Sequence, residues 1–234
     1  MTHALAIDTT SDYLSLAVLR AGRPAASRYE PCGNRMARVI FSRVDEMLRG
    51  AGLTPAALDF LAVAHGPGSF TGTRIGMAVA LTFSQVTGKP LLGVDSLRIL
   101  AEQTDPRRAG RFHVLLNCAR DEIYYAPYRR HEDGRLEPLA PIVLTSLALA
   151  LAAAGGEPVV LRRFSASGPD PLPPGVERMP LTREFPDGEL LLQAALTRFR
   201  ERPAGPFPKV EPLYLKPDAL RTWTPAHAAA RPGH

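Results

Sequence analysis

Hydrophobic positions along the first hundred residues follow two different periods. Short apolar runs between polar or glycine-containing turns predict strands, and apolar residues three or four apart predict helices. In chain order we expect strands at 4–8 and 14–20, a strand ending near Tyr29, a helix at 35–51, a strand at 58–66, a helix at 72–87, a strand at 90–94 and a helix at 97–103. The predicted order is therefore β-β-β-α-β-α-β-α.

That order is characteristic of the ribonuclease-H-like half-domain found in actin, sugar kinases and Hsp70, although a fold alone does not define a function. The second half of the chain repeats it in part. There we expect strands at 112–118, 122–129, 136–144 and 158–161 and helices at 146–154 and 188–201. The prediction is an α/β protein with an actin-like (ribonuclease-H-like, ASKHA) fold of two related lobes, 1–104 and 105–217. The Ala/Pro/His-rich residues 218–234 are expected to be a disordered tail.

Composition narrows the function classes. Of 234 residues, 45% are hydrophobic and 22% charged, which is ordinary for a globular protein. The net charge of +5 comes from scattered arginines, so we expect direct nucleic-acid binding by this chain to be weak and salt-sensitive. The two cysteines, Cys32 and Cys118, lie far apart, which favours a reducing cytoplasm. No two of the six histidines have the helical spacing of metal ligands, so we expect no metal site.

Two features of the sequence bear on whether the protein enters or crosses a membrane. The N-terminus lacks a basic region followed by an apolar one, so we expect no secretory leader. Residues 138–156 carry no charge, but Pro138, Pro141 and the Gly155-Gly156 pair interrupt them. We therefore expect a strand and a short helix there, and a cytoplasmic protein without a membrane anchor.

The run AHGPGSFTGTRIG at 64–76 raises the possibility of a phosphate loop. A P-loop needs a lysine directly after its last glycine, whereas Thr73 and Arg74 follow Gly72. The dinucleotide fingerprint also fails, since Thr71 stands in place of its third glycine. Backbone N–H groups at the start of the following helix leave an anion site open as an alternative.

Asp8 ends the first predicted strand, where ribonuclease-H-like ATPases and nucleases place a catalytic carboxylate. With Thr9 and Thr10 it is a weak candidate for a phosphate-facing turn. The alternative is that Asp8 caps the turn through its own side chain. No further carboxylates are placed to complete a two-metal centre.

The helix expected at 72–87 carries a stripe of small residues, Gly72, Gly76, Ala80 and Ser84. No charged residue lies between Ile75 and Gly88, which is typical of a helix buried on all sides. We expect Ile75, Val79 and Val86 to face the sheet. The small side is then covered by the first helix of the same chain or by a partner.

Several segments together resemble the TsaB (YeaZ) family: LAIDTTSDYLSLAVL (5–19), HGPGSFTGTRIGMAVA (65–80), GKPLLGVDSLRILA (88–101), RDEIYYAPYRR (120–130) and EPLYLK (211–216). The GPGSFTG-x-RIG block followed by GVxSL is specific, and the resemblance covers most of residues 3–216. It implies an actin-like fold of two lobes and a paralogue of TsaD that lacks its metal-binding histidine pair. It also implies a non-catalytic role, without cofactor, beside TsaD and the ATPase TsaE in N6-threonylcarbamoyladenosine synthesis next to the tRNA anticodon.

The resemblance further implies that the two helices of the first lobe form the pairing surface, with tRNA reached through the complex. The residues expected at this interface are Arg35, Val39, Arg43, Gly72, Arg74, Gly76, Met77, Ala80 and Ser84. Basic side chains on the first helix predict an acidic rim on the partner. An uncovered helix pair also predicts a homodimer through the same helices.

This sequence departs from the family pattern at two places. Met36 and Ala37 align with the histidine-serine pair that usually begins the first helix, and residues 117–119 replace the family's DAR. Both changes weaken any remaining metal or phosphate role. An ATP-binding enzyme of the actin/sugar-kinase class, using Asp8, is the alternative function. A metalloprotease is disfavoured because no ligand pair is present.

Overall fold

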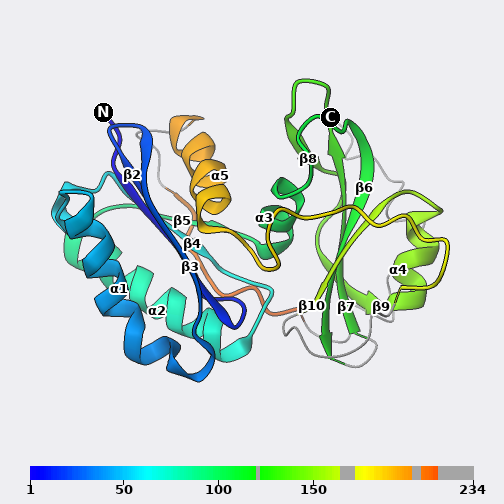
Figure 1. Ribbon diagram of the computed structural model, residues 1–234, viewed down its shortest axis with the longest axis horizontal. Coiled ribbons are helices and arrows are strands. Elements are labelled where there is room, and N and C mark those ends of the chain that lie inside the picture. The colour runs from blue at the N-terminus through cyan, green and yellow to red at the C-terminus, as the bar shows by residue number, and fades with distance from the viewer. Residues whose placement is uncertain (120–121, 164–171, 202–206, 216–234) are drawn as a thin grey trace. The chain divides into compact units, whose positions relative to one another are not determined.

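The computed structural model describes residues 1–119, 122–163, 172–201 and 207–215, with side chains 118 and 119 excepted. The chain divides into two units (Figure 1). The first unit contains residues 1–99 and 185–213, and the second contains residues 100–184 and 214–234. Each unit is built around its own mixed sheet.

The first unit has a five-stranded sheet in the order β3-β2-β1-β4-β5. Its strands are β1 (Ala4–Asp8), β2 (Tyr13–Arg20), β3 (Arg23–Pro31), β4 (Phe60–Ala64) and β5 (Leu91–Val94). The first three strands form an antiparallel meander, and β4 and β5 continue the sheet parallel to β1. The predicted strands and their order are therefore confirmed.

Helices α1 (Met36–Gly50) and α2 (Phe70–Thr87) cover one face of this sheet, and α5 (Gly188–Glu201) covers the other (Figure 1). Side chains alternate between the faces of a strand, and β1 uses this alternation. Leu5 and Ile7 join the core beneath α1 and α2, whereas Ala4 and Ala6 join the core beneath α5. Two short 3-10 helices, Gly33–Arg35 and Pro55–Ala57, precede α1 and β4.

Helix α2 begins and ends at residues suited to those positions. The Ser69 hydroxyl oxygen accepts a hydrogen bond from the Gly72 N–H at 3.2 Å, which satisfies one of the unpaired donors of the first turn. Gly88 follows the helix at φ 66°, a left-handed conformation that favours glycine. The expected helix is confirmed and begins two residues earlier than predicted.

The second unit holds a sheet in the order β10-β6-β7-β8, with β9 also paired to β7. Its strands are β6 (Gly110–Ala119), β7 (Glu122–Arg130), β8 (Leu136–Pro138), β9 (Val143–Ser146) and β10 (Val159–Arg163). Helix α4 (Leu147–Ala154) packs on it, and α3 (Ser96–Glu102) lies where the chain passes from the first unit to the second. The prediction of a single strand at 136–144 is wrong. Two short strands pair with different parts of β7, and Pro141 lies between them.

The boundary expected between the lobes also differs from the structure. Residues 185–213, assigned by sequence to the second lobe, return to the first unit. The reason is the apolar face of α5, where Leu191, Leu192 and Ala195 pack against the alanine-rich face of the first sheet. The tail expected at 218–234 lies outside the described residues. None of the helices in the described ranges combines the length and apolarity needed to cross a membrane.

Candidate functional site

The Asp8 side chain closes the turn between β1 and β2. Its Oδ1 accepts hydrogen bonds from the Thr10 N–H at 2.7 Å and the Thr10 hydroxyl at 2.8 Å. The carboxyl group is 1% exposed, and burial raises its pKa to about 7. Asp8 therefore caps its own turn, which was the alternative interpretation of this residue.

Thr9 and Thr10 fill the space in front of the glycine-rich corner at 66–76. The Ser69 N–H donates to the Thr10 carbonyl at 2.7 Å, and the Thr9 hydroxyl donates to the Gly72 carbonyl at 2.7 Å. A Cβ atom at Gly68 would overlap the Thr10 carbonyl, and one at Gly72 would overlap the Thr9 carbonyl. The glycines thus admit the chain's own backbone at this corner.

The small-residue stripe on α2 faces inward, which corrects the expected orientation of this helix. A Cβ atom at Gly76 would overlap the Thr9 hydroxyl, and Ala80 is fully buried. Val86, expected to face the sheet, is instead 81% exposed. Glycine and alanine let α2 approach the end of β1 closely, so the small side packs on the sheet. Val79 is buried in the same core and Ile75 packs against it, as expected, so the correction concerns Val86 and the small residues.

The outward side of α1 and α2 carries exposed apolar side chains. Phe41 on α1 and Phe70 on α2 are 54% and 55% exposed, and Leu81 and Val86 on α2 are also exposed. The rings of Phe41 and Phe83 lie 6.3 Å apart, so the apolar surface is continuous between the helices. We call the exposed residues Phe41, Phe70, Arg74, Ala78, Leu81 and Val86 the α1–α2 surface.

The predicted interface residues separate into two groups. Four are buried within the first unit, so a partner does not reach them in this structure: Gly72, Gly76, Met77 and Ala80. Arg35 and Arg74 are exposed, while Val39, Arg43 and Ser84 are half-buried. The Ser84 hydroxyl donates to the Lys89 carbonyl at 2.6 Å. The Arg74 guanidinium lies 3.7 Å from the centre of the Phe70 ring, a cation–π contact that places it on the α1–α2 surface.

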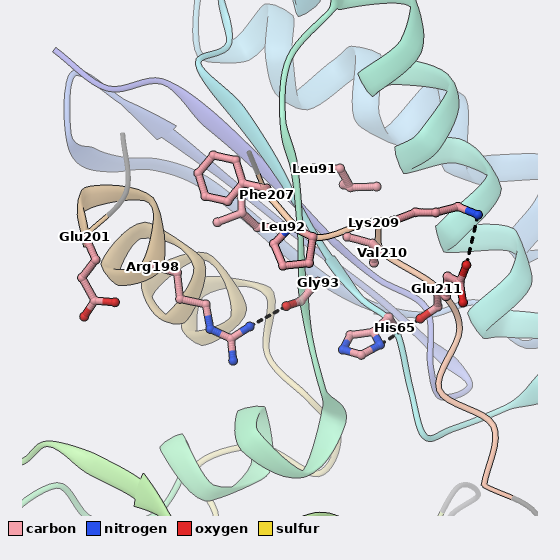
Figure 2. A pocket seen from close by; sticks show the side chains of 11 residues that line it. His65, Leu91, Leu92, Gly93, Arg198, Glu201, Phe207, Lys209, Val210 and Glu211 are labelled. Carbon is pink, nitrogen blue, oxygen red and sulfur yellow. Dashed lines mark hydrogen bonds and ion pairs between the residues drawn. The ribbon is translucent and has the colours of Figure 1, made fainter. Parts of the chain in front are cut away.

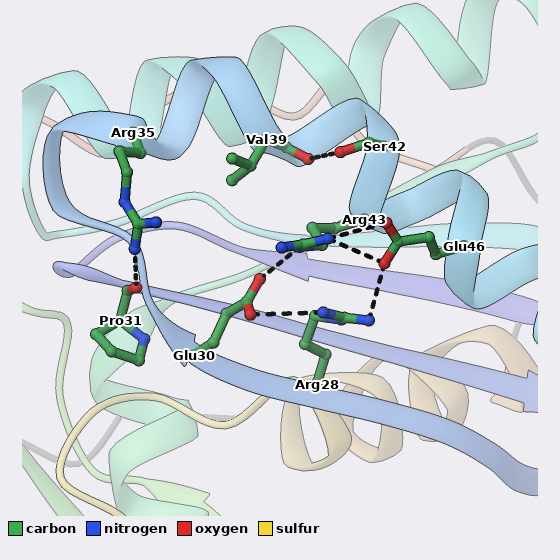
Figure 3. Close-up of polar contacts among 8 residues, drawn as sticks. All are labelled: Arg28, Glu30, Pro31, Arg35, Val39, Ser42, Arg43 and Glu46. Atoms are coloured by element: carbon green, nitrogen blue, oxygen red, sulfur yellow. Dashed lines mark hydrogen bonds and ion pairs between the residues drawn. The ribbon is translucent and has the colours of Figure 1, made fainter.

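Arg43 lies in an ion-pair network with its own chain (Figure 3). Its guanidinium contacts Glu30 at 2.8 Å and Glu46 at 2.9 Å. Arg28 contacts the same two carboxylates, at 3.4 Å and 3.0 Å. The hydrogen bond with Glu30 raises the pKa of Arg43. The charge of Arg43 is therefore balanced within its own chain, and the acidic rim on the partner stays a prediction.

Sequence reasoning missed Phe41, Phe70 and Leu81. The signal was present, because Phe41 follows Ile40 and so lies about 100° around the helix from the buried stripe of Met36, Ile40 and Val44. A large apolar residue off the buried stripe indicates an exposed contact surface.

The structure also bears on metal binding. Within the described part of the chain, no three His, Cys, Asp or Glu side chains gather closely enough to hold a metal ion. Cys32 is buried and forms no disulfide.

The fold and its two units define the class of protein: the chain has an actin-like, ASKHA-type fold. The family model described as TsaD: tRNA N6-adenosine threonylcarbamoyltransferase matches residues 32–170. YeaZ from Pseudomonas aeruginosa has a solved structure that is 25% identical, with a TM-score of 0.71, and the match covers 92% of this chain and 100% of that one.

Two curated relatives are named tRNA threonylcarbamoyladenosine biosynthesis protein TsaB. The Escherichia coli protein is 34% identical over 132 residues, 56% of each chain. The Bacillus subtilis protein is 30% identical over 137 residues, 58% of this chain and 59% of that protein. The match thus spans little more than half the length of these relatives. The chain belongs to the TsaB/YeaZ family.

Proposed function

We propose that this protein acts in the biosynthesis of N6-threonylcarbamoyladenosine in tRNA, as a non-catalytic subunit that binds a TsaD-type paralogue. The observation that carries the proposal is the α1–α2 surface, where Phe41, Phe70 and Leu81 are exposed and Arg74 packs over the Phe70 ring. Aromatic and arginine side chains are enriched at protein interfaces. The names of the relatives supply the pathway.

A non-catalytic role is supported by the Asp8 turn. In an ATP-binding enzyme of the actin/sugar-kinase class, this turn would have to leave room for phosphate. Here Thr9 and Thr10 occupy that room: the Thr9 hydroxyl donates to the Gly72 carbonyl, and the Thr10 carbonyl accepts from the Ser69 N–H. The proposal includes no cofactor of its own. In it, a TsaE-type ATPase joins the complex, tRNA is bound by the complex as a whole, and the work takes place in the cytoplasm.

The experiment is to mix the purified chain with the TsaD-type paralogue from the same organism and measure molar mass by size-exclusion chromatography with light scattering. The proposal expects a peak whose mass equals one copy of each chain. Two separate peaks, with and without nucleotide and the TsaE-type ATPase, would contradict it.

A further inference from the structure

A cavity of about 510 Å³ opens beside β5 in the first unit (Figure 2). Its walls are Leu91–Gly93 on β5, Arg198 and Glu201 on the last turns of α5, His65 after β4, and residues 207–211. It contains none of the residues of the α1–α2 surface or of the Asp8 turn, so it is independent of the proposed function.

The cavity exists because β5 is an edge strand with a glycine at its third position. A Cβ atom at Gly93 would lie 2.7 Å from Val210 and 3.0 Å from the His65 ring, so only glycine lets residues 207–211 cross the strand this closely. Successive carbonyls of a strand point to opposite edges. The Val94 carbonyl accepts from the His65 N–H toward β4, and the Gly93 carbonyl points to the unpaired edge.

Arg198 covers that edge. Its Nη1 donates to the Gly93 carbonyl at 2.7 Å, which holds the guanidinium at the mouth of the cavity (Figure 2). Within the described ranges, Arg198 makes no ion pair. Glu201 lines the same cavity, but Figure 2 shows its carboxylate directed away from the Arg198 guanidinium. Arg198 therefore has N–H donors left for an anion, since a guanidinium carries five.

Glu201 is the other lining charge without an ion-pair partner among the described residues, and the Asp95 carboxylate interacts electrostatically with Arg198 from outside the lining. The remaining groups are balanced or neutral. Lys209 pairs with Glu211 at 3.0 Å. The His65 Nδ1 lies 3.1 Å from the Glu211 carbonyl, which only accepts, so Nδ1 carries the proton and donates. Burial lowers the pKa of His65, which leaves its ring neutral at pH 7. Arg198 is thus the cation of this lining that a ligand can use.

The rest of the lining is apolar. Leu91 and Leu92 are buried in the wall, and Phe207 stacks on Phe199 with ring centres 6.0 Å apart. Small-molecule sites have volumes of roughly 300–1,000 Å³, apolar walls and a few polar groups that fix orientation. We propose that this cavity binds a small organic carboxylate, whose carboxylate group pairs with Arg198 and whose apolar body lies against Leu92 and Phe207.

The test is an NMR titration of the ¹⁵N-labelled full chain with 3-phenylpropionate, and in parallel with its neutral amide, 3-phenylpropanamide. We expect saturable shifts of the backbone signals of residues 91–93. Because a charged hydrogen-bonded pair is lost, we expect the amide to bind about tenfold more weakly than the acid.

Arg198→Gln should weaken 3-phenylpropionate about tenfold. Arg200→Gln is the matched control, since Arg200 is exposed on the same helix and does not line the cavity. It should leave binding within about twofold. Any one of three results would overturn the proposal. They are the absence of saturable shifts at 91–93, equal affinities of the acid and the amide, and equal effects of the two arginine variants.

Discussion

The Thr9 hydroxyl donates a 2.7 Å hydrogen bond to the carbonyl of Gly72, 63 residues further along the chain. This contact joins the turn after β1 to the first turn of α2. It explains both the glycine-rich corner and the orientation of α2. With the small residues packed against β1 and with Met77 and Val79 in the core, Phe70 and Leu81 of α2 are left outside.

Replacement of Gly72 by alanine should destabilise the first unit by about 3 kcal/mol or more, because the new methyl group would overlap the Thr9 carbonyl and backbone must move. Gly50→Ala is the matched control, since nothing lies within 4 Å of a Cβ atom there. That variant should be unchanged or about 0.5 kcal/mol more stable. Urea unfolding measures both, and equal stabilities of the two variants would refute the packing explanation.

Stability should fall as pH rises toward 8 because of Asp8. Its folded-state pKa is about 7, above the ordinary aspartate value of 3.8, so between these values the folded state holds a proton that the unfolded state has lost. The Asp8 contribution is therefore complete below about pH 3.8, falls progressively as pH rises above that value, and is gone above about pH 7. Between pH 5 and 8 the loss is on the order of 1–3 kcal/mol. Asp8→Asn should remove this part of the pH dependence in urea unfolding measured at both pH values. An unchanged pH dependence would mean that Asp8 is ionised throughout.

Phe41 and Arg43 should differ in their effect on partner binding. Phe41→Ser removes an exposed ring and should weaken binding of the TsaD-type paralogue at least tenfold, which is typical of an aromatic anchor. Arg43→Gln should change the affinity by less than about threefold, since Glu30 and Glu46 already hold its charge. Isothermal titration of the two variants measures this. A larger effect of Arg43→Gln would restore Arg43 as a partner contact.

Without its partner the protein should self-associate through the α1–α2 surface, because exposed apolar patches favour association. Leu81→Glu should shift the population from dimer to monomer at the same protein concentration. Sedimentation velocity over a concentration series measures the shift. A dimer that persists in Leu81→Glu would place self-association on another surface.

Hydrophobic periodicity predicted the elements of the first unit well, because Met36, Ile40, Val44 and Met47 really do form one buried stripe. It did not predict which side of α2 is buried. That side is decided by a backbone contact between Gly72 and Thr9, which no pattern of hydrophobicity along α2 records.

Two other features also depended on contacts between distant segments. The return of α5 to the first unit depends on Ala4 and Ala6, whose small side chains leave a flat surface on which Leu191 packs. These residues are far apart in the sequence. The ion pair between Arg43 and Glu30 joins α1 to β3. The sequence showed that Arg43 is charged, but not that Glu30 lies beside it and neutralises this charge.

The most direct test of the account is isothermal titration of the TsaD-type paralogue into the wild-type chain, Ala78→Arg and Ala152→Arg. Ala78 is exposed in the middle of the outward side of α2, whereas Ala80 is buried and its replacement would test folding instead. Ala152 is an exposed alanine on α4 in the second unit and provides the matched control. We predict that Ala78→Arg weakens binding at least tenfold while Ala152→Arg stays within about twofold of wild type. Equal affinities of all three proteins would contradict the assignment of the α1–α2 surface as the partner interface.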